Sequence, residues 1–156
     1  MKTKIGIALL PLLFMMACGT AEQSKEAEKV ESNKIILKGY NDKYVTIVGD
    51  TALVASQPDA AKAEVFEKID QGNGKWALKT SGDKFITDDG GKLVANRTAV
   101  GAWEEFEIIP LGNNNSQINL KSYTGKIVCV DGGMGDRLFS NRDQASTWET
   151  ITVESK

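Results

Sequence analysis

The sequence predicts an all-β domain made of three similar units, each holding four short strands. One phrase occurs three times without a gap: "ALVASQPDAAKAEVF" from Ala52, "KLVANRTAVGAWEEF" from Lys92 and "RLFSNRDQASTWETI" from Arg137. A second phrase precedes each copy: "ILKGYNDKYV", "ALKTSGDKFI" and "NLKSYTGKIV". Short runs rich in Val, Ile, Thr, Tyr and Phe are separated by Gly, Asp and Asn clusters, which is typical of antiparallel strands joined by tight turns.

The length and number of the repeats indicate the architecture. Each unit spans about 40 to 45 residues, a period that fits either propeller blades or the units of a β-trefoil. A propeller needs at least four blades to close its ring, whereas this chain has three units. We therefore expect a β-trefoil with pseudo-three-fold symmetry, in which the units close a six-stranded barrel and cap it with three hairpins. The expected domain is residues 34–156, with repeats at about 34–73, 74–115 and 116–156.

The period of two within each strand predicts which side chains face the core. Four columns of large side chains recur in step: Ile35, Trp76 and Ile118; Leu37, Leu78 and Leu120; Leu53, Leu93 and Leu138; Phe66, Phe106 and Ile151. Burial of each is worth about 1.5–3 kcal/mol before entropy is counted. The third repeat differs in its second hairpin, where the longer loop Asp131–Asp136 replaces a tight turn.

The N-terminal residues 1–17 have the pattern of a secretory signal peptide. Lys2 and Lys4 precede an apolar run that is too short to span a bilayer as a stable helix, and small Ala17 stands at the expected cleavage site. Met15-Met16-Ala17-Cys18 resembles the lipobox of bacterial lipoproteins. That resemblance implies that Cys18 is acylated and becomes the first residue of the mature protein. The alternative is an ordinary secreted protein in which this cysteine is incidental.

The segment after the cleavage site is expected to be a tether. Residues 18–33 carry Cys18 followed by "GTAEQSKEAEKVESN", which has no aromatic residue and a single β-branched aliphatic, Val30. Such a segment cannot bury enough apolar surface to offset the entropy of ordering, although a short helix remains an alternative. Gly19 rather than Asp follows the cysteine, which favours the outer membrane under the lipoprotein sorting rule. We therefore expect a lipid-anchored protein of the bacterial outer membrane or cell surface.

Composition argues against several functions. The signal peptide holds two of the 19 basic residues and none of the 21 acidic ones, so the remaining chain has 17 basic against 21 acidic side chains. Without a basic surplus, nucleic acid is not an expected partner. The chain has no histidine, which removes the commonest general base and metal ligand. With Cys18 acylated, Cys129 has no disulfide partner, and "KIVCV" predicts a small buried hydrophobe.

No nucleophile elbow, phosphate-cradling loop or Cys/His pair is present in the sequence. We therefore expect a protein that is not an enzyme, with no cofactor and no metal. Calcium held by Asp88 and Asp89, or by Asp131 and Asp136, is a weaker alternative, because their spacing matches no recognised calcium loop.

The stretch "DKFITDDGGKLVANRTAVGAWEEF", residues 83–106, resembles the repeat unit of fascin-like β-trefoil domains. The resemblance covers about residues 34–154 and implies a trefoil without settling its function. Ricin-type trefoil lectins carry Gln-x-Trp, whereas the comparable positions here read Ala-Glu-Val, Trp-Glu-Glu and Trp-Glu-Thr. That lectin site is therefore not carried over. Fascins bundle actin through several trefoils in tandem, an arrangement that a single trefoil lacks.

Recurrence separates structural residues from functional ones. A residue found in all three units is more often required by the fold than by a ligand, because a site is rarely needed at every symmetric place. On this ground we expect ion pairs or hairpin hydrogen bonds for two recurring sets: Glu64, Glu104 and Glu149; Lys43, Lys84 and Lys126. We also assign Trp103 and Trp148 to the repeating frame.

Function is expected where the units differ. The candidate ligand-binding residues are Tyr40, Asp88, Asp89, Asn113, Asn114, Tyr123, Asp131 and Asp136. The two tyrosines occupy matching turns and offer rings on which a sugar can stack, while the Asp and Asn side chains supply hydrogen bonds. Asp, Asn and Gly are also what any hairpin turn favours, so plain turns are the alternative for each loop.

Two functions of different class remain. The first is a non-catalytic envelope lipoprotein whose trefoil binds an oligo- or polysaccharide. The second is a protein-interaction or scaffold module of the envelope with no sugar ligand. A shallow groove that combines an exposed aromatic ring with two or more carboxylates or amides would favour the first. In either case we expect a monomer held to the membrane by its N-terminal lipid.

Overall fold

The computed structural model describes residues 32–113 and 116–156. The predicted signal peptide, Cys18 and nearly all of the predicted tether lie outside the described residues, as does Asn114. Within the part that is described, no helix is long and apolar enough to cross a membrane.

The described residues form twelve strands, four in each repeat, together with four short 3-10 helices. The first repeat contains β1 (Lys34–Lys38), β2 (Tyr44–Val48), β3 (Ala52–Gln57), η1 (Ala60–Lys62) and β4 (Phe66–Gly72). The second contains β5 (Lys75–Lys79), β6 (Phe85–Asp89), β7 (Lys92–Arg97), η2 (Ala102–Glu104) and β8 (Phe106–Pro110). The third contains β9 (Gln117–Lys121), β10 (Ile127–Asp131), η3 (Gly132–Met134), β11 (Arg137–Arg142), η4 (Thr147–Glu149) and β12 (Ile151–Ser155).

The first and last strands of the repeats close a six-stranded barrel. Antiparallel pairing runs β1–β4, β4–β5, β5–β8, β8–β9, β9–β12 and back from β12 to β1. Equivalent residues occupy equivalent places within each repeat, since Ile35 pairs with Phe66, Trp76 with Phe106, and Ile118 with Ile151. Closure leaves no free barrel edge for another chain to pair with.

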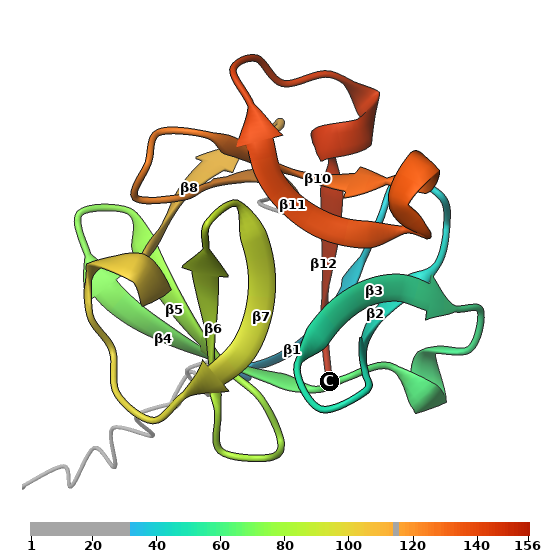
Figure 1. The fold of residues 1–156 in the computed structure, drawn as a ribbon, viewed down its shortest axis with the longest axis horizontal. Helices are drawn as coiled ribbons and strands as arrows, with labels where there is room; N and C mark the ends of the chain where they lie inside the picture. The colour runs from blue at the N-terminus through green and yellow to red at the C-terminus, as the bar shows by residue number, and fades with distance from the viewer. Residues whose placement is uncertain (1–31, 114–115) are drawn as a thin grey trace, which may run out of the picture. The chain divides into compact units, whose positions relative to one another are not determined.

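The middle strands of each repeat form the hairpins β2–β3, β6–β7 and β10–β11, which lie in front in the view of Figure 1. Strands β3, β7 and β11 also pair with one another and join the hairpins into a cap. Each hairpin has a register shift at the same place, after Tyr44, Phe85 and Ile127. The expected all-β trefoil of three four-stranded units is therefore confirmed.

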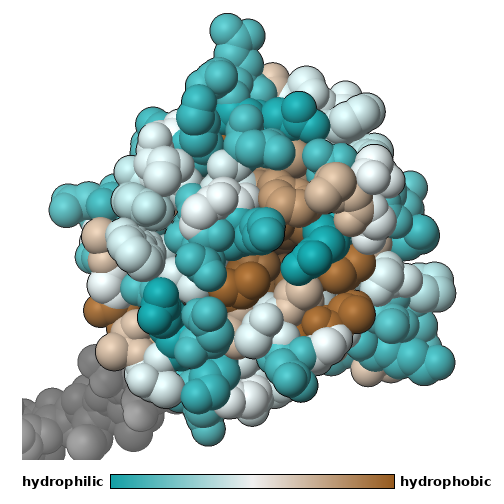
Figure 2. Space-filling view, viewed as in Figure 1, coloured by the Kyte–Doolittle hydropathy of each residue, from teal (hydrophilic) through white to brown (hydrophobic). Residues whose placement is uncertain are grey.

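The core brings together the predicted columns of apolar side chains. Leu37, Leu78 and Leu120 belong to one buried cluster with Leu53, Leu93, Leu138, Phe66, Phe106 and Ile151. Trp76 differs from the prediction, because it is only partly buried at the edge of that cluster and Lys68 Nζ lies 4.8 Å from its ring centroid. On the cap face, Figure 2 shows hydrophobic side chains gathered near the centre and framed by hydrophilic ones.

The turn after the first strand of each repeat follows one backbone plan. Asp42 and Asp83 have φ of 60°, and Gly125 at the equivalent place has φ of 80°. Asp tolerates this left-handed conformation better than most residues and Gly adopts it freely, which explains the sequence pattern at this position. Each of these three turns lies against the end of another repeat: the first turn against the third repeat, the second against the first, and the third against the second.

Candidate functional site

Three equivalent pockets lie where the end of one repeat meets the first turn of the next. We name them by the repeats that meet. The third–first junction has a pocket of about 470 Å³, the first–second junction one of about 450 Å³ and the second–third junction one of about 230 Å³. Because barrel closure sets the last repeat against the first, the third–first pocket is formed by the two ends of the domain sequence.

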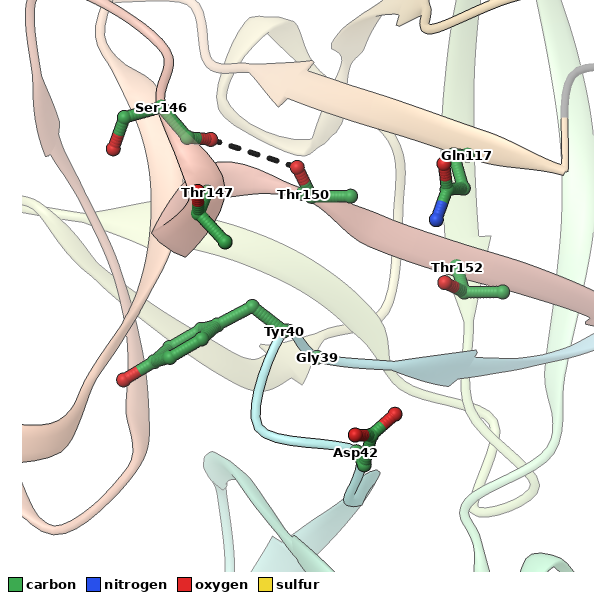
Figure 3. Close-up of a pocket in the computed structure, with 8 residues that line it drawn as sticks. All are labelled: Gly39, Tyr40, Asp42, Gln117, Ser146, Thr147, Thr150 and Thr152. Atoms are coloured by element: carbon green, nitrogen blue, oxygen red, sulfur yellow. Dashed lines mark hydrogen bonds between the residues drawn. The ribbon is translucent and has the colours of Figure 1, made fainter.

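The third–first pocket is lined mainly by neutral polar groups, as Figure 3 shows. Its lining residues are Gly39, Tyr40, Asp42, Gln117, Ser146, Thr147, Thr150 and Thr152. Tyr40 and Asp42 come from the turn after β1, and Gln117 begins β9. In Figure 3, Tyr40 lies on one side of the pocket and Gln117 with Thr152 on the other. Thr150 Oγ1 donates a hydrogen bond of 3.5 Å to the Ser146 carbonyl.

The second–third junction carries ion pairs where this pocket has neutral groups. Lys75 and Glu105, aligned with Gln117 and Thr150, form an ion pair of 3.0 Å at the second–third junction. Lys121 and Glu107 form another there, at 3.2 Å. The first–second pocket is lined by Lys34, Lys79 and Lys156 together with Glu67 and Asp83. Only Asp42 contributes a formal charge to the lining of the third–first pocket, and Lys38 Nζ lies 3.7 Å from its carboxylate.

An aromatic stack stands beside this pocket. The rings of Tyr40 and Trp148 have centroids 5.9 Å apart and planes inclined by 12°. The guanidinium carbon of Arg142 lies 5.7 Å from the Trp148 ring centroid. Trp148 remains 46% exposed although it is a large aromatic side chain. Tyr40 and Arg142 each cover part of the indole, and the exposed ring surface that remains is able to contact the apolar face of a ligand.

A buried carboxylate holds this stack in place. Glu149 is 2% exposed and accepts hydrogen bonds from the Ser146 backbone N–H at 2.6 Å and from the Ser146 hydroxyl at 2.8 Å. Its other oxygen lies 3.6 Å from Arg142 Nε. Glu149 thereby caps η4, which carries Trp148, and also fixes the arginine that covers the indole. A platform positioned in this way loses little conformational freedom on binding.

The recurring acids and lysines have the structural roles that the sequence predicted. Glu104 repeats the role of Glu149, accepting from the Gly101 N–H at 2.8 Å, whereas Glu64 accepts from the Ser81 N–H at 2.7 Å. Lys43 pairs with Asp136 and Lys126 with Asp143. In the second repeat the link is a hairpin hydrogen bond, from the Lys84 N–H to Thr80 Oγ1.

Four of the predicted ligand-binding residues lie on the surface of the described structure, and a fifth lies outside it. Tyr40 lines the third–first pocket and Tyr123 the second–third pocket. Asp89 and Asn113 are exposed but line none of the three junction pockets, while Asn114 lies outside the described residues.

Asp88, Asp131 and Asp136, in the β6–β7 and β10–β11 hairpins, form hydrogen bonds or ion pairs within the protein. Asp88 is 1% exposed and accepts hydrogen bonds from the Gly91 N–H at 2.7 Å and from Ser140 Oγ at 2.5 Å. This burial corrects the prediction for Asp88, which no ligand can reach. Asp131 accepts from the Gly133 N–H at 3.0 Å and Asp136 pairs with Lys43 at 3.2 Å, so both support the long third hairpin.

Sequence reasoning missed most of the pocket. Gln117, Thr147, Thr150 and Thr152 look like ordinary strand and turn residues when each is read alone. The available signal was their contrast with the charged residues of the aligned columns. Trp103 and Trp148, which the sequence assigned to the repeating frame, are 45% and 46% exposed, and Ala63 occupies the aligned position of the first repeat.

The described residues do not contain a group of three or more His, Cys, Asp or Glu side chains able to hold a metal ion. Cys129 is buried, and burial raises the pKa of its thiol, with nearby Arg142 acting in the opposite direction.

Taken together, a six-stranded barrel and three capping hairpins define a β-trefoil domain, with a surface pocket at each junction between repeats. Comparison with family models matches the Fascin domain over residues 20–108, more than half of the chain. The chain belongs to the Fascin domain family. A comparison with curated protein sequences found no match.

Solved structures of the same fold share little sequence with the chain. The designed three-fold symmetric protein ThreeFoil is similar with a TM-score of 0.68 and 13% identity, over 80% of this chain and all of that one. Lysenin in complex with phosphocholine has a TM-score of 0.61 at 16% identity, over 79% of this chain and 44% of lysenin. A GlcNAcα1-4Gal releasing endo-β-galactosidase from Clostridium perfringens has a TM-score of 0.64 at 8% identity, over 79% of this chain and 32% of the enzyme.

Proposed function

We propose that this chain is a non-catalytic lipoprotein of the bacterial envelope that binds a neutral oligo- or polysaccharide in the third–first pocket. Cys18 carries the lipid that holds it at the outer membrane or cell surface, and residues 18–33 space the trefoil from the membrane. The observation that carries the proposal is one pocket in which an aromatic ring, a carboxylate and an amide meet, namely Tyr40, Asp42 and Gln117.

The chemistry of the pocket suits a sugar. A sugar ring presents an apolar face of C–H groups and a rim of hydroxyls that both donate and accept hydrogen bonds. Tyr40 and Trp148 supply a rigid aromatic surface, and the hydroxyls of Thr147, Thr150 and Thr152 can also both donate and accept. A pocket of about 470 Å³ has room for one or two sugar rings.

The lining also favours a neutral ligand over an anionic one. Each of the other junctions brings lysines into its pocket, whereas no lysine or arginine lines this one. The Asp42 side chain is 92% exposed on the pocket rim, 3.7 Å from Lys38 Nζ, and its oxygens can accept hydrogen bonds from sugar hydroxyls. We therefore expect neutral hexose or pentose units rather than uronic acids.

The structural relatives support this proposal only through the fold. The endo-β-galactosidase acts on a carbohydrate by its name, and part of it shares the trefoil. Because one fold serves many functions, this relation adds less than the pocket lining does.

The alternative is a protein-interaction module. Exposed Trp148 and Trp103 favour it, because tryptophan is enriched where protein surfaces meet. The two functions differ in what Gln117 and the threonines contribute, since a sugar needs their hydrogen bonds whereas a protein partner depends mainly on the indoles.

The test is affinity electrophoresis of the full chain, purified in a mild detergent, through native gels that contain a neutral galactan, glucan, mannan or xylan. We expect at least one of the four to retard the chain, and Tyr40→Ser or Thr147→Ala to reduce that retardation. Tyr40→Ser copies Ser81, the aligned residue of the second repeat, so the fold already accepts serine there. Lys62→Ala is the matched control, because Lys62 is aligned with Thr147 but lies on η1 outside the pocket.

Normal mobility in all four gels, combined with capture of one defined envelope protein that Trp148→Ala no longer binds, would replace this proposal by the protein-interaction function.

A further inference from the structure

We propose that the chain holds a second glycan-binding platform at the second–third junction, formed by Trp103, Tyr123 and Arg97, and that the domain is therefore bivalent. This inference rests on the proposed function and extends it from one site to two.

The second platform repeats the geometry of the first. The rings of Trp103 and Tyr123 have centroids 5.7 Å apart and planes inclined by 24°. The guanidinium carbon of Arg97 lies 5.7 Å from the Trp103 ring centroid, the same distance as at the first platform. Trp103 is 45% exposed and Tyr123 is 46% exposed, so the pair presents aromatic surface to solvent.

The same kind of support lies beneath it. Glu104 is buried and accepts a hydrogen bond from the N–H of Gly101, the N-cap residue of η2. Its carboxylate lies 3.9 Å from Arg97 Nε. The buried acid thus caps the 3-10 helix that carries the tryptophan and positions the arginine beside it. A second pocket, of about 440 Å³, borders this platform and is lined by Arg97, Val100 and Trp103 among others.

The first–second junction shows that the fold does not require these stacks. All three members are absent there together, because Gln57, Ala63 and Ser81 occupy the aligned positions. Glu64 instead bonds to the Ser81 N–H and hydroxyl, at 2.7 and 2.8 Å, and the repeats still join. The arginine, tryptophan and tyrosine occur together at two junctions and are replaced together at the third. This pattern indicates that the three side chains act as one functional unit.

The two platforms differ in the chemistry next to the stack. At the third–first junction the neighbouring pocket is lined by the Thr147 and Thr152 hydroxyls and the Gln117 amide, whereas at the second–third junction Lys75–Glu105 and Lys121–Glu107 ion pairs occupy the corresponding space. The second platform therefore binds sugar mainly by stacking, and we expect it to be the weaker of the two.

Bivalency changes what the domain does to a polymer. The two platforms belong to different lobes of one rigid barrel, so a polysaccharide can engage both, or two chains can be held by one protein. Once one platform is bound, the second meets a linked sugar at a high effective concentration. The apparent affinity for a repeating polymer therefore exceeds that for a short oligosaccharide by about 10²-fold or more.

The test uses the full chain in mild detergent and the neutral hexasaccharide of whichever of the four polysaccharides retards it. Calorimetric titration is expected to show two hexasaccharides per chain with unequal affinities. Trp103→Ala with Tyr123→Ser, which copies the residues of the first–second junction, is expected to remove the weaker site and leave the stronger one unchanged. Trp148→Ala with Tyr40→Ser is expected to do the reverse. Each double variant should lower the apparent affinity for the intact polysaccharide by about tenfold or more, whereas Lys62→Ala should not.

A titration of one hexasaccharide per chain that Trp103→Ala with Tyr123→Ser leaves unchanged would overturn this inference while the proposed function stands. Loss of both sites in the Trp148→Ala with Tyr40→Ser variant would overturn it as well. Failure of the unaltered chain to bind any of the four polysaccharides would instead overturn the proposed function itself. One further variant tests why the two sites differ in affinity. Lys75→Gln with Glu105→Thr gives the second–third junction pocket the residues Gln and Thr that line the third–first pocket, and is expected to raise the affinity of the weaker site.

Discussion

The indole of Trp148 lies nearly parallel to the phenol of Tyr40, at 12° and 5.9 Å between centroids, although the two residues come from the last and first repeats. Ring closure of the barrel brings them together. Beside them Gln117 and Thr150 stand where Lys75 and Glu105 form an ion pair at the second–third junction, so a stacking surface adjoins neutral hydrogen-bonding groups. The proposal of sugar binding depends on this combination.

The neutral lining can be removed by restoring the charges found in the other repeat. Gln117→Lys with Thr150→Glu rebuilds the pair that Lys75 and Glu105 form at 3.0 Å. Because the new side chains fill the pocket and pair with each other, we expect affinity for the bound neutral polysaccharide to fall at least about tenfold, the worth of one or two lost hydrogen bonds. Affinity electrophoresis measures this change.

The same double variant should fold normally, since the second repeat tolerates the pair. Its free energy of unfolding in urea should stay within about 0.5 kcal/mol of the unaltered chain. Retained sugar binding in a folded double variant would show that the third–first pocket is not the site.

Two adjacent acids of β6 are expected to respond in opposite ways to removal. Asp88 is buried and accepts from Gly91 and Ser140, whereas Asp89 is exposed. Asp88→Ala leaves those donors unpaired, so we expect a loss of about 1–3 kcal/mol in the free energy of unfolding. Asp89→Ala, the matched control, should change it by no more than about 0.5 kcal/mol. Urea denaturation followed by tryptophan fluorescence measures both, and equal effects would contradict the assigned role of Asp88.

Stability at high pH should depend on Tyr44. Burial raises the pKa of Tyr44, and the hydrogen bond from its hydroxyl to the Glu154 carboxylate, at 3.2 Å, raises it further. The folded protein therefore holds this proton more tightly than the unfolded chain, in which tyrosine has a pKa of about 10. The resulting stabilisation is fully present below pH of about 10 and is lost as the pH rises through the folded-state pKa.

We expect the unaltered chain to lose more stability between pH of about 8 and 11 than Tyr44→Phe does, as measured by urea midpoints at each pH. The other tyrosines and lysines titrate in both proteins and cancel in this difference. Parallel pH profiles for the two proteins would refute the role given to the Tyr44–Glu154 bond.

The lipid anchor is tested at Cys18. We expect the unaltered chain to sediment with the membrane fraction and its N-terminal peptide to carry the added mass of acyl chains. Cys18→Ser should appear in the soluble fraction without that mass, because acylation needs the thiol. Cys129→Ser is the control, since Cys129 is buried in the trefoil and should not affect fractionation. Membrane association that survives Cys18→Ser would refute the anchor.

Several features could be predicted from sequence because they repeat. The aligned Leu37, Leu78 and Leu120 predicted a common core, and the three share one buried cluster. The recurring glutamates predicted structural hydrogen bonds, and Glu104 and Glu149 each cap a 3-10 helix. Tyr40 lines the third–first pocket, and its role in ligand binding stays a prediction.

Other features depend on which residues become neighbours. Asp88 and Asp89 look alike in sequence, yet strand alternation and packing against β11 bury the first and expose the second. Thr150 and Thr152 became candidates only when the pocket placed them near Tyr40.

The sequence by itself determined the number of repeats, the four strands within each and the apolar columns of the core. Strand periodicity and turn residues are local properties, and their recurrence in three aligned copies identifies them in the sequence. Tertiary structure alone decided that Tyr40 meets Trp148, that Tyr123 meets Trp103 and that the pocket between the third and first repeats is lined mainly by uncharged polar groups. The reason is geometric: those partners are separated along the chain and become neighbours only when the barrel closes.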